Sequence, residues 1–401
     1  MTKGMMHSKI RPLVGVNQDP GTAAREEMPT PGRLLKPAAF GFYVVIALEI
    51  LFMISPFALY FYSVYGPVLR FLQRSPETAW LTQFFLPHIS ETRSAFLNGL
   101  HWLSGPLVIA GTVLFLAGAI PIYWSKLRHR DAVTGGLYRF IRHPQYGGLS
   151  ILGLGTLLLW PRFLVLISYV VMVFLYVGLA RWEEECCLAR FGDSYRNYQT
   201  RAGMFLPKFL SSKVPRIFPV VGSGGVLVRL GLFGFSMVAM LWLSFQLRDY
   251  SLGKICVAYS EDTVVLSPAV LSPEELLSAC RTSVTDRRVL VKLEAAEPGN
   301  LMVYVVPAAW YLADLPIEEI PRNAPGHGHY QPANFDRRYY KVLFARARTH
   351  PGQVPAEQIL KAAYGLDPIV LARVDISAGT VGGVETPPEQ VYWGDIPTPM
   401  F

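Results

Sequence analysis

The segment Arg142-His143-Pro144-Gln145-Tyr146-Gly147-Gly148 opens a long apolar stretch that runs to residue 180. That stretch is interrupted once, by Trp160-Pro161-Arg162. Proline has no backbone N–H and is tolerated where a helix turns or starts. The pattern therefore predicts a helical hairpin with its turn at Pro161. Because a hairpin returns the chain to the face it left, its two ends, at Arg142-His143 and at Glu183-Glu184, are expected to lie close together.

Five apolar segments are long enough to cross or nearly cross a bilayer, for which about 20 residues are needed. They are 38–63, 101–124, 147–160, 162–180 and 223–247, and the third is short for a full span. The first segment is too long for a cleaved signal peptide. The sequence therefore predicts, over residues 37–248, a multi-span α-helical membrane domain of about five transmembrane helices that includes the hairpin.

Charge is unevenly distributed along the chain. Residues 1–250 hold 24 Lys and Arg against 12 Asp and Glu, a net charge of +12, whereas residues 251–401 hold 13 against 17, a net charge of −4. Lys and Arg gather in the N-terminal segment and in the loops 125–146 and 181–222, while the loop 64–100 holds three. The positive-inside rule then places the N-terminus and the hairpin's open end in the cytoplasm. With five spans, the C-terminal part is expected on the opposite face of the membrane. The expected location is a bacterial-type inner membrane.

Composition limits the classes of protein and partner. The chain is 51% hydrophobic and 16% charged, against about 25% charged in ordinary soluble domains, which excludes a disordered or nucleic-acid-tail protein. The basic half thus indicates membrane lipids, and no nucleic acid, as partners. Residues 1–36, which mix Pro, Gly and Thr with six Lys and Arg, predict a disordered cytoplasmic segment.

Residues 249–401 predict an α+β extramembrane domain. Strands are expected at 256–259, 263–266, 288–294, 301–311 and 368–376, and helices after Ser272 and at 355–364. Ser272, a proline and Glu275 form the pattern of a capping box. Cys256 and Cys280 could pair if the domain lies outside the cytoplasm. No motif in this domain indicates its role. It could bind a partner in a membrane complex.

The residues at the open end of the hairpin carry the chemistry. His143 beside Pro144 presents a titratable ring at a helix start. Glu183 and Glu184 could hold a cationic ligand, and Tyr195 and Tyr198 share one face of a short helix. Taken singly, each motif is more often a helix cap, a solvated face or an interfacial anchor. Together and in this order they fit a cation-containing cofactor at the membrane surface. No metal-ligand spacing is present, since His327 and His329 alternate in a loop without an evident third ligand.

This constellation resembles the isoprenylcysteine carboxyl methyltransferase family, within the integral-membrane methyltransferases that include phospholipid methyltransferases. The resemblance covers about residues 134–208. The matching residues are Thr134, Gly136, Tyr138, Arg142, His143, Pro144, Tyr146, Gly148, Gly155, Thr156, Pro161, Glu183, Glu184, Phe191, Gly192, Tyr195 and Tyr198.

The resemblance implies S-adenosylmethionine as cofactor and methyl transfer to a lipophilic acceptor, which would be a lipid, an isoprenoid-like small molecule or a prenylated protein. It implies that His143, Tyr146 and Glu184 contact the cofactor with support from Glu183, and that Arg142 steers an anionic group. Arg142 and Glu183 would be the catalytic residues. The further cofactor-binding residues would be Tyr138, Pro144, Tyr195 and Tyr198.

Two alternatives stay open. Membrane sterol reductases, which use NADPH, share the Arg-His-Pro-x-Tyr motif and a cysteine placed like Cys187, although five spans and the Glu-Glu pair favour the methyltransferase. A non-catalytic, methyltransferase-like subunit of a larger membrane complex would explain the added C-terminal domain, which a compact methyltransferase does not need.

Overall fold

The computed structural model describes residues 31–63, 66–88, 90–128, 133–211, 223–312, 315–317, 329–350 and 352–388, with side chains from residue 43 onward except at 211, 223 and 224. The chain divides into two compact units, residues 1–50 and 51–401. Most of the segment predicted to be disordered, residues 1–30, lies outside the described residues. Residues 31–36, by contrast, are helical and begin helix α1 (Pro31–Tyr62), so the prediction is wrong for them.

Among the residues that the structure describes, four helices are long and apolar enough to cross a membrane, at Tyr43–Tyr62, Ala95–Leu127, Phe163–Phe191 and Gly225–Leu252. They belong to α1, α4 (Ala95–Leu127), α6 (Phe163–Phe191) and α9 (Ser223–Leu252). The remaining predicted span is α5 (Pro144–Leu159), which has 16 residues. At about 1.5 Å per residue it is roughly 24 Å long, short of the ~30 Å hydrocarbon core. Four of the five predicted spans are thus long enough to cross a membrane, and the fifth, α5, is a shorter helix.

The predicted hairpin is present, and its turn is held by the segment that precedes α4. Phe85 N donates to Pro161 O at 2.8 Å, and Phe163 N donates to Gln83 O at 3.1 Å. Arg162 is fully buried, with its guanidinium 4.0 Å from the centroid of the Phe84 ring. The turn at Pro161 is therefore fixed by backbone pairing and by one buried cation. The short elements around the bundle are α2 (Gly66–Leu72), α3 (Pro76–Ala79), η1 (Trp80–Thr82), η2 (Gly136–Arg139), α7 (Asp193–Arg201) and α8 (Lys208–Ser211).

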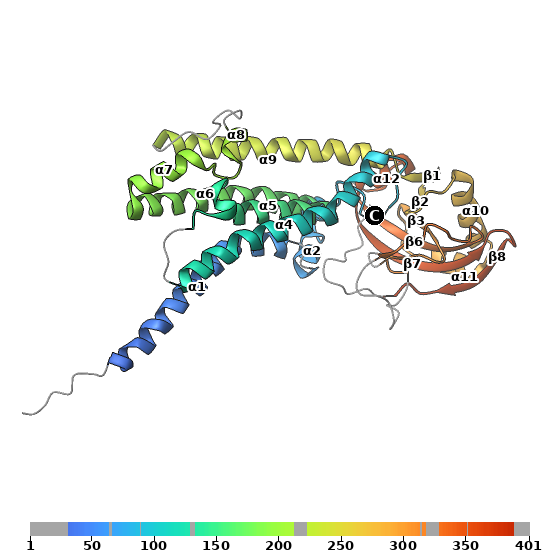
Figure 1. The fold of residues 1–401 in the computed structure, drawn as a ribbon. Helices are drawn as coiled ribbons and strands as arrows, with labels where there is room; N and C mark the ends of the chain where they lie inside the picture. The colour runs from blue at the N-terminus through green and yellow to red at the C-terminus, as the bar shows by residue number, and fades with distance from the viewer. Residues whose placement is uncertain are drawn as a thin grey trace, which may run out of the picture. The chain divides into compact units, whose positions relative to one another are not determined.

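Glycines set the contact between α4 and α5, which run side by side with α6 and α9 in Figure 1. A Cβ atom on Gly111 would lie 2.3 Å from Leu152 N, and one on Gly148 would lie 2.4 Å from Phe115 N. Small residues let helix backbones approach this closely in membrane proteins. The two glycines therefore fix how α4 and α5 cross, and with it where α5 begins.

The C-terminal part is built on a six-stranded sheet in the order β1-β2-β3-β6-β7-β8, in which β2 and β3 are parallel and the other neighbours antiparallel (Figure 1). Its strands are β1 (Cys256–Ser260), β2 (Thr263–Ser267), β3 (Leu301–Pro307), β6 (Tyr339–Thr349), β7 (Ala363–Asp375) and β8 (Thr380–Glu385), and a separate pair is β4 (Tyr311–Leu312) with β5 (His329–Tyr330). The helices are α10 (Pro273–Val284), α11 (Arg287–Glu294) and α12 (Ala356–Ala362). The α+β class is confirmed, as is the capping box of Ser272 and Glu275.

One predicted strand is wrong. Residues 288–294 form helix α11, because Val289 and Leu293 lie four residues apart on its inward face and the Asp286 side chain accepts a hydrogen bond from Arg288 N at the helix start. Cys256 and Cys280 are both free thiols in the structure, so the possible disulfide is not formed.

The sheet part contacts the helices at the turn of the hairpin. Gln83 Nε2 donates to Ala363 O at 2.8 Å, and Arg248 Nη2 donates to Leu360 O at 3.3 Å. Asp249 also forms an ion pair with Lys361 at 3.0 Å. Since α9 runs on to Leu252, the predicted boundary at 248/249 falls in the last turn of this helix.

The glycine contact can be tested with two neighbouring substitutions. Gly148→Ala should lower the free energy of unfolding by about 1–3 kcal/mol, because its methyl group meets the backbone of α4. Gly147→Ala is the control, since a Cβ there meets nothing within 4 Å. It should be neutral or more stable by up to about 1 kcal/mol. Unfolding in detergent micelles measures both, and equal effects would refute the packing argument.

Candidate active site

The two ends of the hairpin meet, as predicted, and a third segment closes the cluster. Arg142 N donates to Gly203 O at 2.8 Å, and His143 N donates to Met204 O at 3.1 Å. His143 is the N-cap residue of α5, and its side chain is 5% exposed. These bonds tie the start of α5 to the chain that follows α7, and both segments lie beside the C-terminal part of α6.

The carboxylate of Glu184 lies at the centre of this cluster. Its Oε1 accepts from Arg142 Nε at 2.7 Å and lies 3.2 Å from His143 Nε2. Its Oε2 accepts from Gln199 Nε2 at 3.0 Å. With a side chain that is only 10% exposed, Glu184 has both oxygens occupied by protein partners.

Arg142 is held as firmly as its partner. Besides Glu184, its guanidinium donates to the backbone oxygens of Gln199 and Ala202. The side chain is 10% exposed. Arg142 therefore joins α6, α7 and the start of α5, which leaves little of it free to steer a substrate.

Glu183 is the accessible carboxylate of the pair. Its side chain is 38% exposed. Tyr146 donates its hydroxyl to Glu183 Oε1, and Glu183 Oε2 lies 3.4 Å from His143 Nδ1. A partly exposed carboxylate held by a phenol and an imidazole is suited to a cationic ligand at the open end of the hairpin.

The electrostatic environment favours a charged His143. Burial lowers the pKa of the ring, but the close contacts with Glu183 and Glu184 and the negative charge of both outweigh it, so the pKa of His143 is raised. The ring therefore takes up a proton more readily than an ordinary histidine. With both carboxylates ionised, His143 and Arg142 balance them, and the cluster is close to neutral.

Aromatic rings form the wall next to the carboxylates. The His143 and Tyr146 rings are stacked with centroids 5.8 Å apart, and Tyr146 stacks on Tyr176 at 4.9 Å. Tyr176 and Gln199 are site residues that the sequence reasoning missed. Tyr176 lies two helical turns before Glu183 on α6, so its spacing could have revealed it. Gln199 has no such signal, because it lies just outside the motif.

The other predicted tyrosines support the cluster rather than open into it. Tyr138 donates its hydroxyl to Gly118 O at 2.8 Å and also lies 3.1 Å from Gln145 Oε1. Tyr198 donates to Tyr138 O at 2.6 Å, and burial raises its pKa to about 12. The Tyr195 ring lies 5.7 Å from that of Tyr198.

Pro144, the last of the predicted residues, is buried at the first position of α5. It packs where this helix meets Gly118 of α4. Its fixed φ suits a helix start, and its missing N–H costs nothing there. Pro144 thus sets the direction in which α5 leaves the cluster. Direct contact of Pro144, Tyr138, Tyr195 or Tyr198 with a cofactor stays a prediction.

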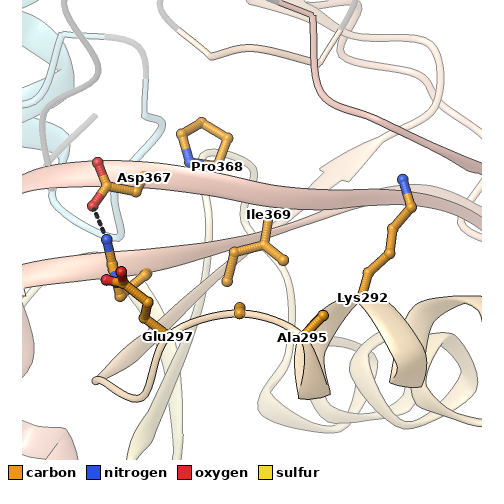
Figure 2. A pocket seen from close by; sticks show the side chains of 8 residues that line it. Lys292, Ala295, Glu297, Asp367, Pro368 and Ile369 are labelled. Atoms are coloured by element: carbon orange, nitrogen blue, oxygen red, sulfur yellow. Dashed lines mark hydrogen bonds and ion pairs between the residues drawn. The ribbon is translucent and has the colours of Figure 1, made fainter.

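Two concavities lie elsewhere, on the sheet part. Figure 2 shows one of them, with a volume of about 410 Å³, between α11 and β7. Arg346 in its wall is paired with Asp367 at 2.9 Å and with Glu297. Its charges are thus already matched within the protein, which gives no reason to expect a ligand there. Over the described part of the chain, no group of three or more His, Cys, Asp or Glu is placed to hold a metal ion.

Comparisons with known proteins match the part of the chain that carries the cluster. The phospholipid methyltransferase family matches residues 121–194. Methanethiol S-methyltransferase of Pseudomonas deceptionensis is 31% identical over 128 residues, 29% of this chain and 47% of the relative. Protein-S-isoprenylcysteine O-methyltransferase of Schizosaccharomyces pombe is 33% identical over 86 residues, 21% of this chain and 36% of the relative.

A third relative, protein-S-isoprenylcysteine O-methyltransferase B of Arabidopsis thaliana, is 28% identical over 104 residues, 25% of this chain and 53% of the relative. The chain spans about half or less of the length of these relatives. No solved structure matches it. The resemblance predicted from the motifs is confirmed: residues 121–194 are similar to the phospholipid methyltransferase family, and two of the relatives are isoprenylcysteine methyltransferases.

Proposed function

We propose that this protein is an integral-membrane methyltransferase that uses S-adenosylmethionine and acts on a lipophilic, isoprenoid- or lipid-like acceptor. The observation that carries the proposal is the cluster of Arg142, His143, Glu183 and Glu184. It forms where two apolar helices end, within the stretch that resembles membrane methyltransferases. The reductase and the non-catalytic subunit gain no support from the three relatives named above.

The residues present fit this cofactor. S-adenosylmethionine carries a sulfonium and an α-ammonium, and when bound it supplies an electrophilic methyl group. Glu183 offers a carboxylate with a 38% exposed side chain beside the stacked rings of His143 and Tyr146. Carboxylates attract such cations, and aromatic faces add cation–π attraction. The cluster therefore has the groups needed to bind and orient a sulfonium.

Within the proposed site, the two glutamates have different tasks. The resemblance suggested that Glu184 contacts the cofactor and Glu183 supports it. The hydrogen bonds favour the reverse, because Arg142, His143 and Gln199 already occupy Glu184. Glu184 is then the positioning residue that fixes His143 and Arg142, while Glu183 and Tyr146 face the cofactor.

Catalysis of this kind depends mainly on position. The acceptor atom has to be held in line with the methyl group, and fixed geometry can supply a large part of the rate enhancement. A carboxylate acceptor needs no base, whereas a thiol, hydroxyl or amine has to lose a proton. Glu183 is the accessible carboxylate of the cluster and would accept that proton. The sulfur and oxygen acceptors in the relatives' names leave both cases open.

The activity is tested by incubating membranes that contain the protein with methyl-labelled S-adenosylmethionine. Lipid extracts and volatile products are then examined by mass spectrometry. A label in an extracted lipid or isoprenoid supports the proposed acceptor class, and a label only in small volatile thioethers contradicts it. No transfer to any product, together with binding of NADPH, would support the reductase instead.

The two glutamates can be separated by binding measurements. Glu183→Gln should weaken S-adenosylmethionine binding at least tenfold, about 1.4 kcal/mol, without a large loss of stability. Glu184→Gln should lower the free energy of unfolding by a few kcal/mol, because it breaks a buried ion pair. Glu185→Gln is the control, since Glu185 is exposed on the same turn. Calorimetry and unfolding in detergent report both quantities, and unchanged binding by Glu183→Gln would overturn the assignment.

The raised pKa of His143 predicts how stability depends on pH. A raised folded-state pKa means that the protonated ring adds stability, fully present below about pH 6.5, that is lost as the pH rises through the folded pKa. The difference in melting temperature between wild type and His143→Gln should therefore shrink from pH 6 to pH 9. In the Glu184→Gln background the decline should begin at lower pH. A difference that does not vary with pH would contradict the ion cluster.

We infer that the cluster faces the cytoplasm and the sheet part faces the opposite side, from the distribution of Lys and Arg and the passage of five helices. Cys186, at the cluster end of α6, and Ser377, in the turn before β8, are both exposed. In variants with a single cysteine, a membrane-impermeant maleimide should label Cys186 only in inverted vesicles. It should label Ser377→Cys only in right-side-out cells. Labelling of both cysteines from the same side would mean that the chain crosses the membrane an even number of times between them. That result would contradict the inferred arrangement.

A further inference from the structure

The imidazole rings of two histidines, His88 and His329, meet outside the methyltransferase-like cluster. His88 follows the segment that holds the hairpin turn, and His329 lies in strand β5. Their Nε2 atoms are 3.3 Å apart, and the rings are nearly perpendicular, with centroids 5.1 Å apart and an angle of 80°. The rings thus meet through their nitrogen atoms, not through their faces.

Each ring is held by its own surroundings. His88 is 8% exposed, stacks on Phe84 with centroids 5.0 Å apart, and lies 6.4 Å from the Trp160 ring. His329 pairs through its backbone with Leu312, which is buried in the core of the sheet part. The two nitrogen atoms are therefore presented by separate elements, and the exposed His329 leaves the site open to solvent.

The separation of the nitrogen atoms matches that of two ligands on one tetrahedral ion. Zn–N bonds of about 2.0–2.1 Å at tetrahedral angles place two ligand nitrogens about 3.3–3.4 Å apart. Neutral imidazole is the commonest ligand for Zn²⁺ and suits other first-row divalent ions. We propose that His88 and His329 bind a divalent transition-metal ion such as Zn²⁺, with water at the remaining positions.

The proposed site is a two-imidazole site. The described residues contain no cluster of three or more His, Cys, Asp or Glu arranged around a metal, so neither a closed structural zinc centre nor very tight binding is expected. At this position a bound ion would hold two segments of the protein together. It links the segment that pairs with the hairpin turn to the β4–β5 pair, in addition to the bond from Gln83 to Ala363. Because the ion binds the joined state, it should raise the stability of the protein.

The test uses the full chain, purified in detergent without a polyhistidine tag and stripped with EDTA. Calorimetric titration with ZnCl₂ should show one bound ion per chain and a higher melting temperature. His88→Gln and His329→Gln should each weaken binding at least tenfold and abolish the thermal shift. His350→Gln, which changes another exposed histidine, should behave as wild type. Cobalt(II) should give visible absorption bands in wild type that His329→Gln removes.

Two results would overturn the proposal. Absence of Zn²⁺ binding by the folded wild-type protein would mean that the 3.3 Å contact is an ordinary N–H···N hydrogen bond. Wild-type affinity in folded His329→Gln would place the metal elsewhere. His329→Gln is the decisive variant, because its side chain is exposed and its loss should not disturb folding. Methyl transfer is not used as the readout, so the outcome is independent of the proposed function.

Discussion

The ion cluster around Glu184 is the interaction on which the candidate site depends. One carboxylate on α6 receives Arg142 and His143 from the start of α5 and Gln199 from α7. A carboxylate this deeply buried is tolerable only with such partners, since an unpaired charge would carry a large desolvation penalty. Three consecutive helices are thus held in one arrangement. Because Glu184 is fixed, the position of the accessible Glu183 next to it on α6 is fixed as well.

The cluster can form only because the helices that carry it are fixed at two other places. At the turn, backbone bonds from Phe85 and to Gln83 pair the hairpin with the segment before α4. Along its length, Gly111 and Gly148 allow α4 and α5 to approach until their backbones touch. A shift of α5 by one residue would rotate His143 by about 100° away from Glu184, given 3.6 residues per turn. Close packing therefore sets the precision of the site.

Local sequence was sufficient for those parts of the fold that depend on local chemistry. Pro161 and the apolar runs predicted the hairpin, and the hairpin alone required that Arg142 and His143 meet Glu183 and Glu184. The capping box at Ser272 was likewise readable, because its residues bond to one another. Segment 288–294 was misread as a strand because its Val and Leu residues satisfy both periods, and tertiary packing of Val289 and Leu293 decided for the helix.

The remaining features depend on contacts that no local pattern encodes. Gln199 reaches Glu184 only through the fold of α7, and His88 meets His329 across 241 positions. The roles of the two glutamates were also invisible in sequence, where they are identical neighbours. On a helix, adjacent residues point about 100° apart, so one faces the cluster interior and the other its opening. The difference between them is one of burial, which only the packed structure supplies.

The position of the sheet part limits what it can do for the proposed reaction. Its contacts from Gln83 and Arg248 lie beside the hairpin turn and at the end of α9, whereas the cluster lies at the other end of α5, about 24 Å away for 16 residues. No side chain spans that distance. The sheet part therefore cannot supply a group to the cluster through the contacts at the turn. An influence through these contacts would have to pass along the helices that meet there, including α9. A role in stabilising or adjusting the helices thus follows more directly from these contacts than a role in chemistry.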